Sequence, residues 1–350
     1  MYQRIIKPLL FKLSIDNAHR TALWLLHIVG MLPYGHKLLR NSYRIDHPSL
    51  ERDVFGVKFR NPIGLAAGFD CNGDIINEAA DIGFGFIEVG TITPEPQEGN
   101  PKPRIFRLTR DKAIVNRIGH ANRGWQYAIE NLRKKHSEVV VGCNIGAGNN
   151  TNPKHAAQDF LKCFRTLYQY SDYFTVNLTS DNAALDTKGY NGESLAATLA
   201  PLFEFRRGQS EYRPIMVKIS PDVSDEVLDM VIAVMIDTPL DGIVAVAGTR
   251  QRENLKTSQA SLSKIGSGRL SGVPLRERAI EVVKYIHDKT EGAYPIIGVG
   301  GMMTPADVAR MMEAGASLVQ LYTGFIAEGP STAKKMCQSL IREEATDDKK

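Results

Sequence analysis

Eight short β-rich runs, separated by segments of helical periodicity, recur along the chain from residue 61 onward and limit the folds that it can adopt. Strands that alternate with helices form parallel sheets rather than antiparallel sandwiches. Most of the runs are almost continuously apolar, as strands covered on both faces must be. The pattern predicts an α/β protein, a (β/α)8 TIM barrel, with its strands at residues 61–68, 84–91, 139–146, 173–179, 215–220, 242–247, 295–301 and 318–324.

A doubly wound α/β sheet is the alternative explanation of the same alternation. We disfavour it because no GxGxxG motif follows an early strand, and the glycines within residues 64–68 have a different spacing. The runs tend to end in Gly, Asn, Thr, Ser or Lys, which suits a site at the carboxyl ends of barrel strands. The connections at 94–115 and 182–196 are long enough to form loops that cover such a site.

Composition and charge narrow the classes of function. The 350 residues are 43% hydrophobic and 23% charged with a net charge of +4, as in a globular protein with a large core. The basic residues are dispersed rather than gathered in runs, so nucleic-acid binding is not expected. Cys71, Cys143, Cys163 and Cys337 show no CxxC spacing, so we expect reduced thiols and no metal site. No apolar stretch predicts a secretion signal or a transmembrane span.

The first 33 residues differ from the rest of the chain. Apolar residues fall at helical spacing on both sides of a break at residues 14–16, which predicts two short helices. Lys7, Lys12 and Arg20 lie among large apolar residues, a composition typical of helices resting on a membrane surface. A helical hairpin that plugs the bottom of the barrel is the alternative, because amphipathic helices usually face a core. The predicted division of the chain is a helical extension, the barrel and a charged tail, at residues 1–40, 41–338 and 339–350.

Glycines cluster at the ends of the seventh and eighth predicted strands, within residues 298–301 and at Gly324. Glycine lets backbone N–H groups approach a phosphate closely, and the loops after strands seven and eight are the usual phosphate cradle of this fold. We interpret them as a phosphate site, to which residues 269–272 add backbone donors. Glycines required only for tight turns are the alternative.

Lys218 ends the apolar fifth strand, so its charge is expected in the barrel mouth. Burying this cation unpaired would be costly, and an anion or an electron-rich ring is therefore expected to meet it. A flavin is a suitable partner, because reduction places negative charge near its N1–C2 edge and a fixed cation stabilises that charge. A structural ion pair is the alternative.

Polar side chains also follow the strand ends. Asn116, Asn144, Asn177 and Asn182 each offer amide donors and an acceptor, the groups needed to hold a planar ring that carries amides. One such asparagine is usually a turn residue, but four at one end of a barrel predict a polar pocket. Ser180 lies just past the fourth strand without a GxSxG elbow, which argues against a hydrolase nucleophile. It is either an ordinary loop hydroxyl or a relay for a proton that leaves a substrate carbon.

Several segments resemble the membrane-associated, quinone-dependent dihydroorotate dehydrogenases, and the likeness extends over residues 1–335. The segments are Asn61-Pro-Ile-Gly-Leu-Ala-Ala-Gly-Phe-Asp70, Gly83-Phe-Gly-Phe-Ile-Glu-Val-Gly-Thr91, Gly99-Asn-Pro-Lys-Pro-Arg-Ile-Phe-Arg107, Asn116-Arg-Ile-Gly119 and Leu270-Ser-Gly-Val-Pro-Leu275. The resemblance implies an FMN-dependent dehydrogenase acting on CH–CH bonds with a quinone as acceptor. It also implies a peripheral protein at the cytoplasmic face of the inner membrane.

The family's functional positions carry over to named residues. The resemblance implies FMN contacts at Ala66, Ala67, Gly68, Thr91, Asn144, Asn177, Lys218, Gly272, Gly301, Tyr322 and Thr323. It makes Ser180 the catalytic base. Substrate-contact positions are Asn116, Asn177, Asn182, Cys71, Ala247 and His120. His19, Arg107 and Tyr322 line the quinone passage, with the amino-terminal helices admitting quinone from the membrane surface rather than plugging the barrel.

The sequence departs from the family pattern where the substrate is expected. Cys71 replaces a lysine, and Ala247 with Gly248 replaces an Asn-Thr pair. Further departures are Asp181, Ala183, His120 and Ala121. Dihydroorotate carries a carboxylate and a cyclic imide, and each lost charge-assisted hydrogen bond costs on the order of 1.5–3 kcal/mol.

These departures lead to a hypothesis about the substrate. We expect desaturation of a C–C bond next to a carbonyl on a compound that differs from dihydroorotate. Genuine oxidation of (S)-dihydroorotate to orotate in de novo pyrimidine biosynthesis is the alternative. A catalytically inactive flavin-binding scaffold is the alternative of another class.

Overall fold

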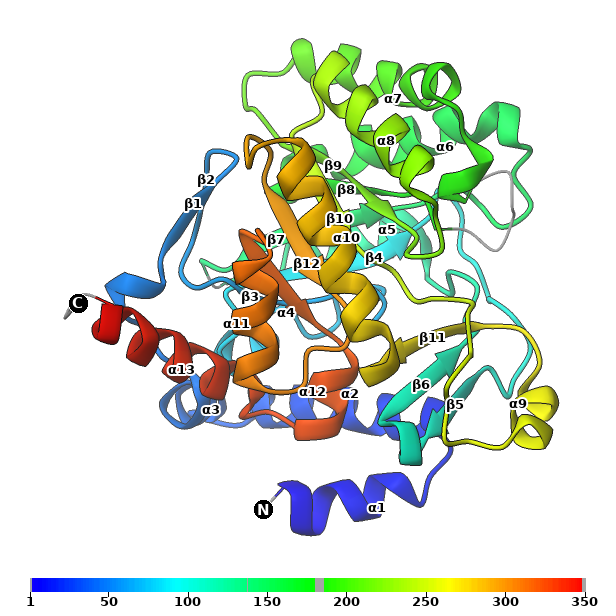
Figure 1. The fold of residues 1–350 in the computed structure, drawn as a ribbon. Helices are drawn as coiled ribbons and strands as arrows, with labels where there is room; N and C mark the ends of the chain where they lie inside the picture. The colour runs from blue at the N-terminus through cyan, green and yellow to red at the C-terminus, as the bar shows by residue number, and fades with distance from the viewer. Residues whose placement is uncertain (1, 137, 180–185, 348–350) are drawn as a thin grey trace.

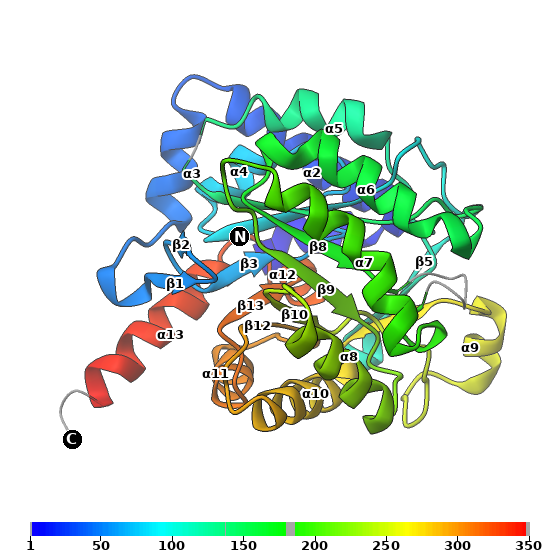
Figure 2. The same cartoon turned by 90° about the horizontal axis from the view of Figure 1, so that it is seen from above.

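Eight parallel strands close into a barrel at the centre of the molecule (Figures 1 and 2). The computed structural model describes residues 2–136, 138–179 and 186–347. Consecutive strands pair around the ring, and the last pairs with the first, with Val319 opposite Ile63. In order they are β3 (Ile63–Leu65), β4 (Phe86–Ile92), β7 (Val140–Ile145), β8 (Tyr173–Asn177), β9 (Ile215–Ile219), β10 (Gly242–Ala245), β12 (Ile296–Val299) and β13 (Leu318–Leu321). The predicted barrel and all eight predicted strands are confirmed.

Helices cover the outside of the barrel, as Figure 2 shows. Each buries a stripe at helical spacing; one of them, α6, buries Phe160, Cys163, Phe164 and Leu167. The covering helices are α4 (Ile76–Asp81), α5 (Gly124–Leu132), α6 (Ala156–Leu167), α7 (Gly192–Arg207), α8 (Asp225–Asp237), α10 (Arg276–Lys289), α11 (Pro305–Glu313), α12 (Thr323–Glu328) and α13 (Thr332–Asp347). Short 3-10 turns lie at Pro48–Leu50, Thr109–Asp111, Pro153–His155, Tyr168–Tyr170, Thr187–Gly189 and Val273–Leu275.

A β-hairpin closes the amino-terminal end of the barrel. It consists of β1 (Arg52–Val54) and β2 (Val57–Phe59), which pair antiparallel. Phe59 is buried against Phe86 and Tyr173 of the barrel, with ring centroids 5.2 and 6.5 Å away. The alternative in which the amino-terminal helices plug this end is therefore wrong, because the hairpin already fills it.

The amino-terminal extension consists of a π-helical turn (Tyr2–Ile6), α1 (Lys7–Phe11), α2 (Ile15–Met31) and α3 (Gly35–Tyr43). The two predicted helices are α1 and α2, and the break between them holds Ser14, whose hydroxyl caps α2 by accepting from the Asn17 N–H. One face of α2 packs on the core through Leu23, Leu26 and Val29. Within the described ranges, no helix is long and apolar enough to cross a bilayer.

The connection at 94–115, expected to be a loop, contains structure of its own. It forms β5 (Ile105–Leu108) and β6 (Ala113–Asn116), which join β11 (Arg269–Gly272) in a three-stranded antiparallel sheet. The short helix α9 (Gln259–Ile265) lies beside this sheet (Figure 1). The expectation of a plain loop failed because the partner strand β11 comes from a distant part of the chain.

The carboxyl-terminal stretch also differs from its prediction. Residues 339–347 were expected to be a charged, frayed tail, but they continue α13. Leu340 is buried and Ile341 packs on the core, so this part of the helix still has an apolar stripe. Arg342 and Glu343, which follow them, are exposed.

Candidate active site

A cavity lies at the carboxyl ends of the barrel strands, where the loops after them meet. It gathers predicted positions that are scattered along most of the sequence. Those lining it are Ala66, Ala67, Gly68, Cys71, Thr91, Asn116, His120, Asn144, Asn177, Lys218, Ala247, Gly272, Gly301, Tyr322 and Thr323. Ser180 and Asn182 lie outside the described residues, and His19 and Arg107 lie away from the cavity wall.

Lys218 lines the cavity from β9, with only 7% of its surface exposed. Burial lowers the pKa of its ammonium group, and the negative charge of Glu88 opposes that shift. Glu88, on β4, is fully buried inside the barrel. Among the described residues no carboxylate forms an ion pair with Lys218, so the alternative of a structural ion pair gains no support, and the ligand-facing role stays a prediction.

The asparagines of the cavity are held in fixed orientations by neighbouring side chains. The Thr91 hydroxyl donates to Asn144 Oδ1 and accepts from Asn177 Nδ2, each over 2.7 Å. Asn144 Nδ2 donates to Glu88 Oε1 over 2.8 Å. Asn116 reaches the cavity from the three-stranded sheet, where it pairs with a residue of β11. Three of the four predicted asparagines therefore meet in one polar pocket.

Glu88 and Gln320 belong to the same polar group and were not predicted. Gln320 Nε2 donates to Glu88 Oε2 over 2.6 Å. A signal for both was present in the sequence, because each interrupts an almost continuously apolar strand, as Lys218 does. Gln320 lines the cavity, and within the described residues its Oε1 is buried without a hydrogen-bond partner. Such an acceptor suits a ligand that carries a donor.

Glycines allow the loops to approach the cavity closely. Gly272, Gly300 and Gly301 line it with φ of +105°, +138° and +74°, a region that L side chains rarely adopt. A Cβ added at Gly301 would come within 2.7 Å of Arg276 Cβ, and one at Gly272 within 2.4 Å of the Lys112 carbonyl oxygen. Glycine is thus required for the turns themselves, and these turns also leave backbone rather than side chain at the cavity wall, as a phosphate cradle needs.

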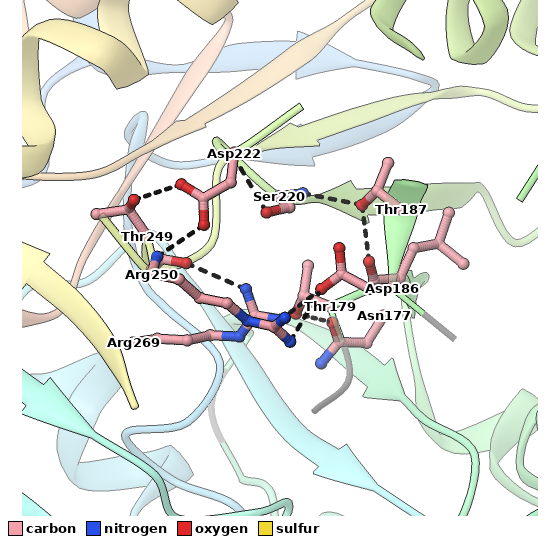
Figure 3. A network of polar contacts seen from close by, with 11 residues as sticks. Asn177, Thr179, Asp186, Thr187, Ser220, Asp222, Thr249, Arg250 and Arg269 are labelled. Atoms are coloured by element: carbon pink, nitrogen blue, oxygen red, sulfur yellow. Dashed lines mark hydrogen bonds and ion pairs between the residues drawn. The ribbon is translucent and has the colours of Figure 1, made fainter. Parts of the chain in front are cut away.

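A second polar group, drawn in Figure 3, joins the loops on one side of the cavity. Arg269 Nη2 lies 2.5 Å from Asp186 Oδ2, and these side chains are only 11% and 2% exposed. Arg250 lies 3.7 Å from the same carboxylate oxygen, and its backbone N–H donates to Asp222. The Thr249 hydroxyl also donates to Asp222. Sequence reasoning missed this group because its members come from separate loops, with 83 positions between Asp186 and Arg269.

Cys71, at a substrate-contact position, lines the cavity as predicted. Burial raises the pKa of its thiol to about 12, and the carboxylates of Asp70 and Asp74 add to the shift. A thiol with this pKa is almost entirely protonated at neutral pH, so Cys71 is not the reactive thiolate that a lowered pKa would produce. Asp70 itself accepts the backbone N–H groups of the segment that leads into α4.

The predicted quinone-passage residues lie between the amino-terminal helices and the cavity. His19 Nε2 is 2.8 Å from the Phe69 carbonyl oxygen, and its ring packs edge-on against the Phe69 ring. Phe69 in turn contacts Tyr322, which lines the cavity. Arg107 stacks on Phe11 at 4.3 Å and donates to backbone carbonyls at the end of α1. These contacts connect the extension with the cavity wall and leave the passage itself a prediction.

The site has a polar cavity at the carboxyl ends of the barrel strands, a buried lysine that lines this cavity, and close-packed glycine loops beside it. These features are typical of the class of barrel enzymes that bind a cofactor. Residues 49–343 match the family Dihydroorotate dehydrogenase. A relative from Christiangramia forsetii, named dihydroorotate dehydrogenase (quinone), is 41% identical over 97% of this chain and 99% of its own. Another relative with the same name, from Synechococcus sp. (strain JA-3-3Ab), is 40% identical over 97% of this chain and 92% of its own. The crystal structure of the Eimeria tenella DHODH in complex with ferulenol has a TM-score of 0.85 at 32% identity, covering 95% of this chain and 92% of that one. The chain belongs to the dihydroorotate dehydrogenase family, a family of oxidoreductases.

The relatives correct the hypothesis of an altered substrate. Full-length relatives at about 40% identity are named for dihydroorotate, so the alternative, dihydroorotate itself, agrees better with them. The hypothesis assumed that replacing a lysine by Cys71 leaves a substrate carboxylate without a cation. Arg117, which was not predicted at the site, lines the cavity and supplies positive charge there, whereas the charge of Arg269 is balanced by Asp186.

Proposed function

We propose that this enzyme oxidises (S)-dihydroorotate to orotate and passes the electrons through FMN to a quinone, as a step of pyrimidine biosynthesis. The observation that supports this most directly is the convergence of Lys218, the amide side chains and the glycine loops on one cavity of a family member. Neither a structural role nor a scaffold requires that combination of groups.

The cavity residues fit FMN by their chemistry. The N–H groups of the loops at Gly272 and Gly301 would hold the phosphate, and Lys218 would lie against the electron-rich edge of the ring. The unpartnered acceptor of Gln320 and the amide of Asn144 offer hydrogen bonds of the kind that a ring bearing amides requires. When bound, FMN supplies the hydride acceptor.

The reaction removes a hydride from one ring carbon and a proton from its neighbour, and a C=C bond forms between the two. We assign the proton to a relay through the Ser180 hydroxyl, which accepts it as its own proton passes to solvent; the sequence places Ser180 directly after Thr179, a residue of the cavity wall. Asn116 and Asn177 would hold the imide of the substrate. Arg117 would meet its carboxylate, since a buried carboxylate needs a compensating cation.

A turnover experiment tests the proposed reaction. The purified protein, supplied with dihydroorotate and a quinone, should release orotate, which is followed by its ultraviolet absorbance, and its flavin should bleach when the quinone is omitted. A flavin that dihydroorotate fails to reduce, but that another cyclic amide or acid reduces, would contradict the proposed substrate. A flavin that no substrate reduces would identify an inactive flavin protein.

We further propose that the amino-terminal extension rests on a membrane surface and admits the quinone. In the described residues, most large hydrophobic side chains that remain exposed lie in this extension. They are Ile5, Leu9, Leu13, Trp24, Leu25, Met31, Leu32, Tyr34 and Leu38. Exposed apolar side chains gathered on one element mark an interaction surface, and the basic residues among them favour an anionic bilayer. The location proposed is the cytoplasmic face of the inner membrane.

A pair of substitutions tests the membrane surface. Ile5→Ser with Leu9→Ser should weaken binding to anionic phospholipid vesicles and raise the KM for a long-chain quinone by about tenfold, because two apolar anchors no longer enter the bilayer. Flavin reduction by substrate should not change. Ile236→Ser, at a position 55% exposed compared with 59% for Leu9, is the matched control outside the extension. Equal effects of the two replacements would argue against a role of the extension.

A further inference from the structure

The polar side chains inside the barrel form a layer above an apolar floor. Glu88 follows Phe86 by two positions on β4, Lys218 follows Met216 on β9, and Gln320 follows Leu318 on β13. Residues two apart on a strand face the same side, so each polar residue stands one step closer to the carboxyl end than its apolar neighbour. Phe86, Met216 and Leu318 belong to one buried cluster.

Glu88 receives hydrogen bonds from three other strands. Asn144 Nδ2 donates to its Oε1 over 2.8 Å, and Gln320 Nε2 donates to its Oε2 over 2.6 Å. The Tyr173 hydroxyl donates to Oε2 over 3.3 Å. Glu88 has no exposed surface, and it does not line the cavity itself. It therefore acts on a bound ligand only through the residues that it holds.

These contacts continue into a chain of hydrogen bonds whose donors all point toward Glu88. The Thr179 hydroxyl donates to Asn177 Oδ1, and Asn177 Nδ2 donates to Thr91 Oγ1. The Thr91 hydroxyl donates to Asn144 Oδ1, and Asn144 donates to Glu88. Every member except Glu88 lines the cavity. The chain thus runs from the loop after β8, which leads to Ser180, to the centre of the barrel.

A carboxylate at the end of this chain determines its direction. An ionised carboxyl group accepts hydrogen bonds and donates none, so both amides next to it must turn their NH2 groups toward it. Asn144 is then left with its oxygen for Thr91, and Gln320 is left with its oxygen as the acceptor that has no partner within the described residues.

We propose that Glu88 is a positioning residue that sets the donor and acceptor directions of Gln320, Asn144, Thr91 and Asn177, and thereby the hydrogen-bonding pattern that the cavity presents to the flavin. The proposal rests on FMN being the cofactor. Replacing the carboxylate by an amide of the same shape removes the constraint, because an amide donates as well as accepts. Each amide along the chain then has two orientations instead of one.

The test is Glu88→Gln, compared with Tyr173→Phe. The second variant removes another hydrogen bond from Glu88 but leaves the chain intact, because Tyr173 is not a member of it. FMN binding to the apoprotein, measured by flavin fluorescence quenching, should weaken by about tenfold to a hundredfold in Glu88→Gln, as expected for a lost charge-assisted hydrogen bond. The flavin midpoint potential should shift to a more positive value, because a buried negative charge is lost. Tyr173→Phe should change neither quantity.

Side-chain amide signals give a readout that needs no cofactor. In the ¹H–¹⁵N spectrum of the apoprotein, the side-chain signals of Asn144, Asn177 and Gln320 should move in Glu88→Gln and stay in place in Tyr173→Phe. Unmoved signals together with an unchanged FMN affinity would overturn the proposal, as would equal effects in the two variants. A wild-type protein that binds no FMN would instead refute the proposed function, while the amide signals would still decide the role of Glu88.

Discussion

Lys218→Met should nearly abolish flavin reduction by substrate. The reduced ring gains negative charge, and in this variant a fixed cation no longer stabilises that charge. Lys218 is 7% exposed and lines the cavity. Stopped-flow bleaching of the flavin by dihydroorotate measures the effect.

A double variant is the control for the charge of Glu88. Lys218→Met combined with Glu88→Gln removes both charges, and flavin reduction should stay slow because the fixed cation is still missing. If the single Lys218→Met variant still reduces its flavin at the original rate, Lys218 does not have the role that we give it.

Ser180→Ala should slow flavin reduction by roughly 10²–10⁴-fold, the usual contribution of a positioned general base. Reoxidation of the reduced flavin by quinone should keep its rate, because no proton leaves a substrate carbon in that half-reaction. Rapid-mixing measurements of each half-reaction distinguish these outcomes. An equal loss in both half-reactions would indicate a damaged flavin site rather than a missing base.

Cys71→Ser is the matched comparison for Ser180→Ala. Cys71 lines the cavity, and a thiol there could take the proton if its pKa were lowered, but burial raises that pKa to about 12. Its replacement by serine should therefore change the rate of flavin reduction much less than Ser180→Ala does. The opposite order of effects would transfer the role of the base to Cys71.

The apolar strand pattern was enough to predict the barrel, because parallel strands buried on both faces must be continuously apolar and must be joined by helices. The same pattern located the residues at strand ends, since those ends meet at one rim of the barrel. Lys218 was found because a charge stood out in an apolar strand. Glu88 and Gln320 carried that signal too and were overlooked in the middle of their strands.

The relatives agree better with dihydroorotate than with the altered substrate that was predicted, and the cavity offers a physical reason. Cys71 and Ala247 are real departures, and both line the cavity. However, the charge at a site is the sum over all of its walls, and Arg117, which directly follows β6, also lines the cavity. Comparing a motif with its family position by position shows that a lysine is missing. It does not show a cation that another segment of the chain brings to the same cavity.

By itself, the sequence determined what depends on local periodicity: the eight strands, the helices between them and the rim at which the polar residues gather. Only the tertiary structure decided which distant segments meet. It paired β11 with β6, brought Asp186 to Arg269, closed the barrel floor with the β1–β2 hairpin and directed a chain of hydrogen bonds toward Glu88. Hydrogen bonds and ion pairs between residues far apart in sequence leave no periodic trace, because their geometry exists only after the barrel has closed.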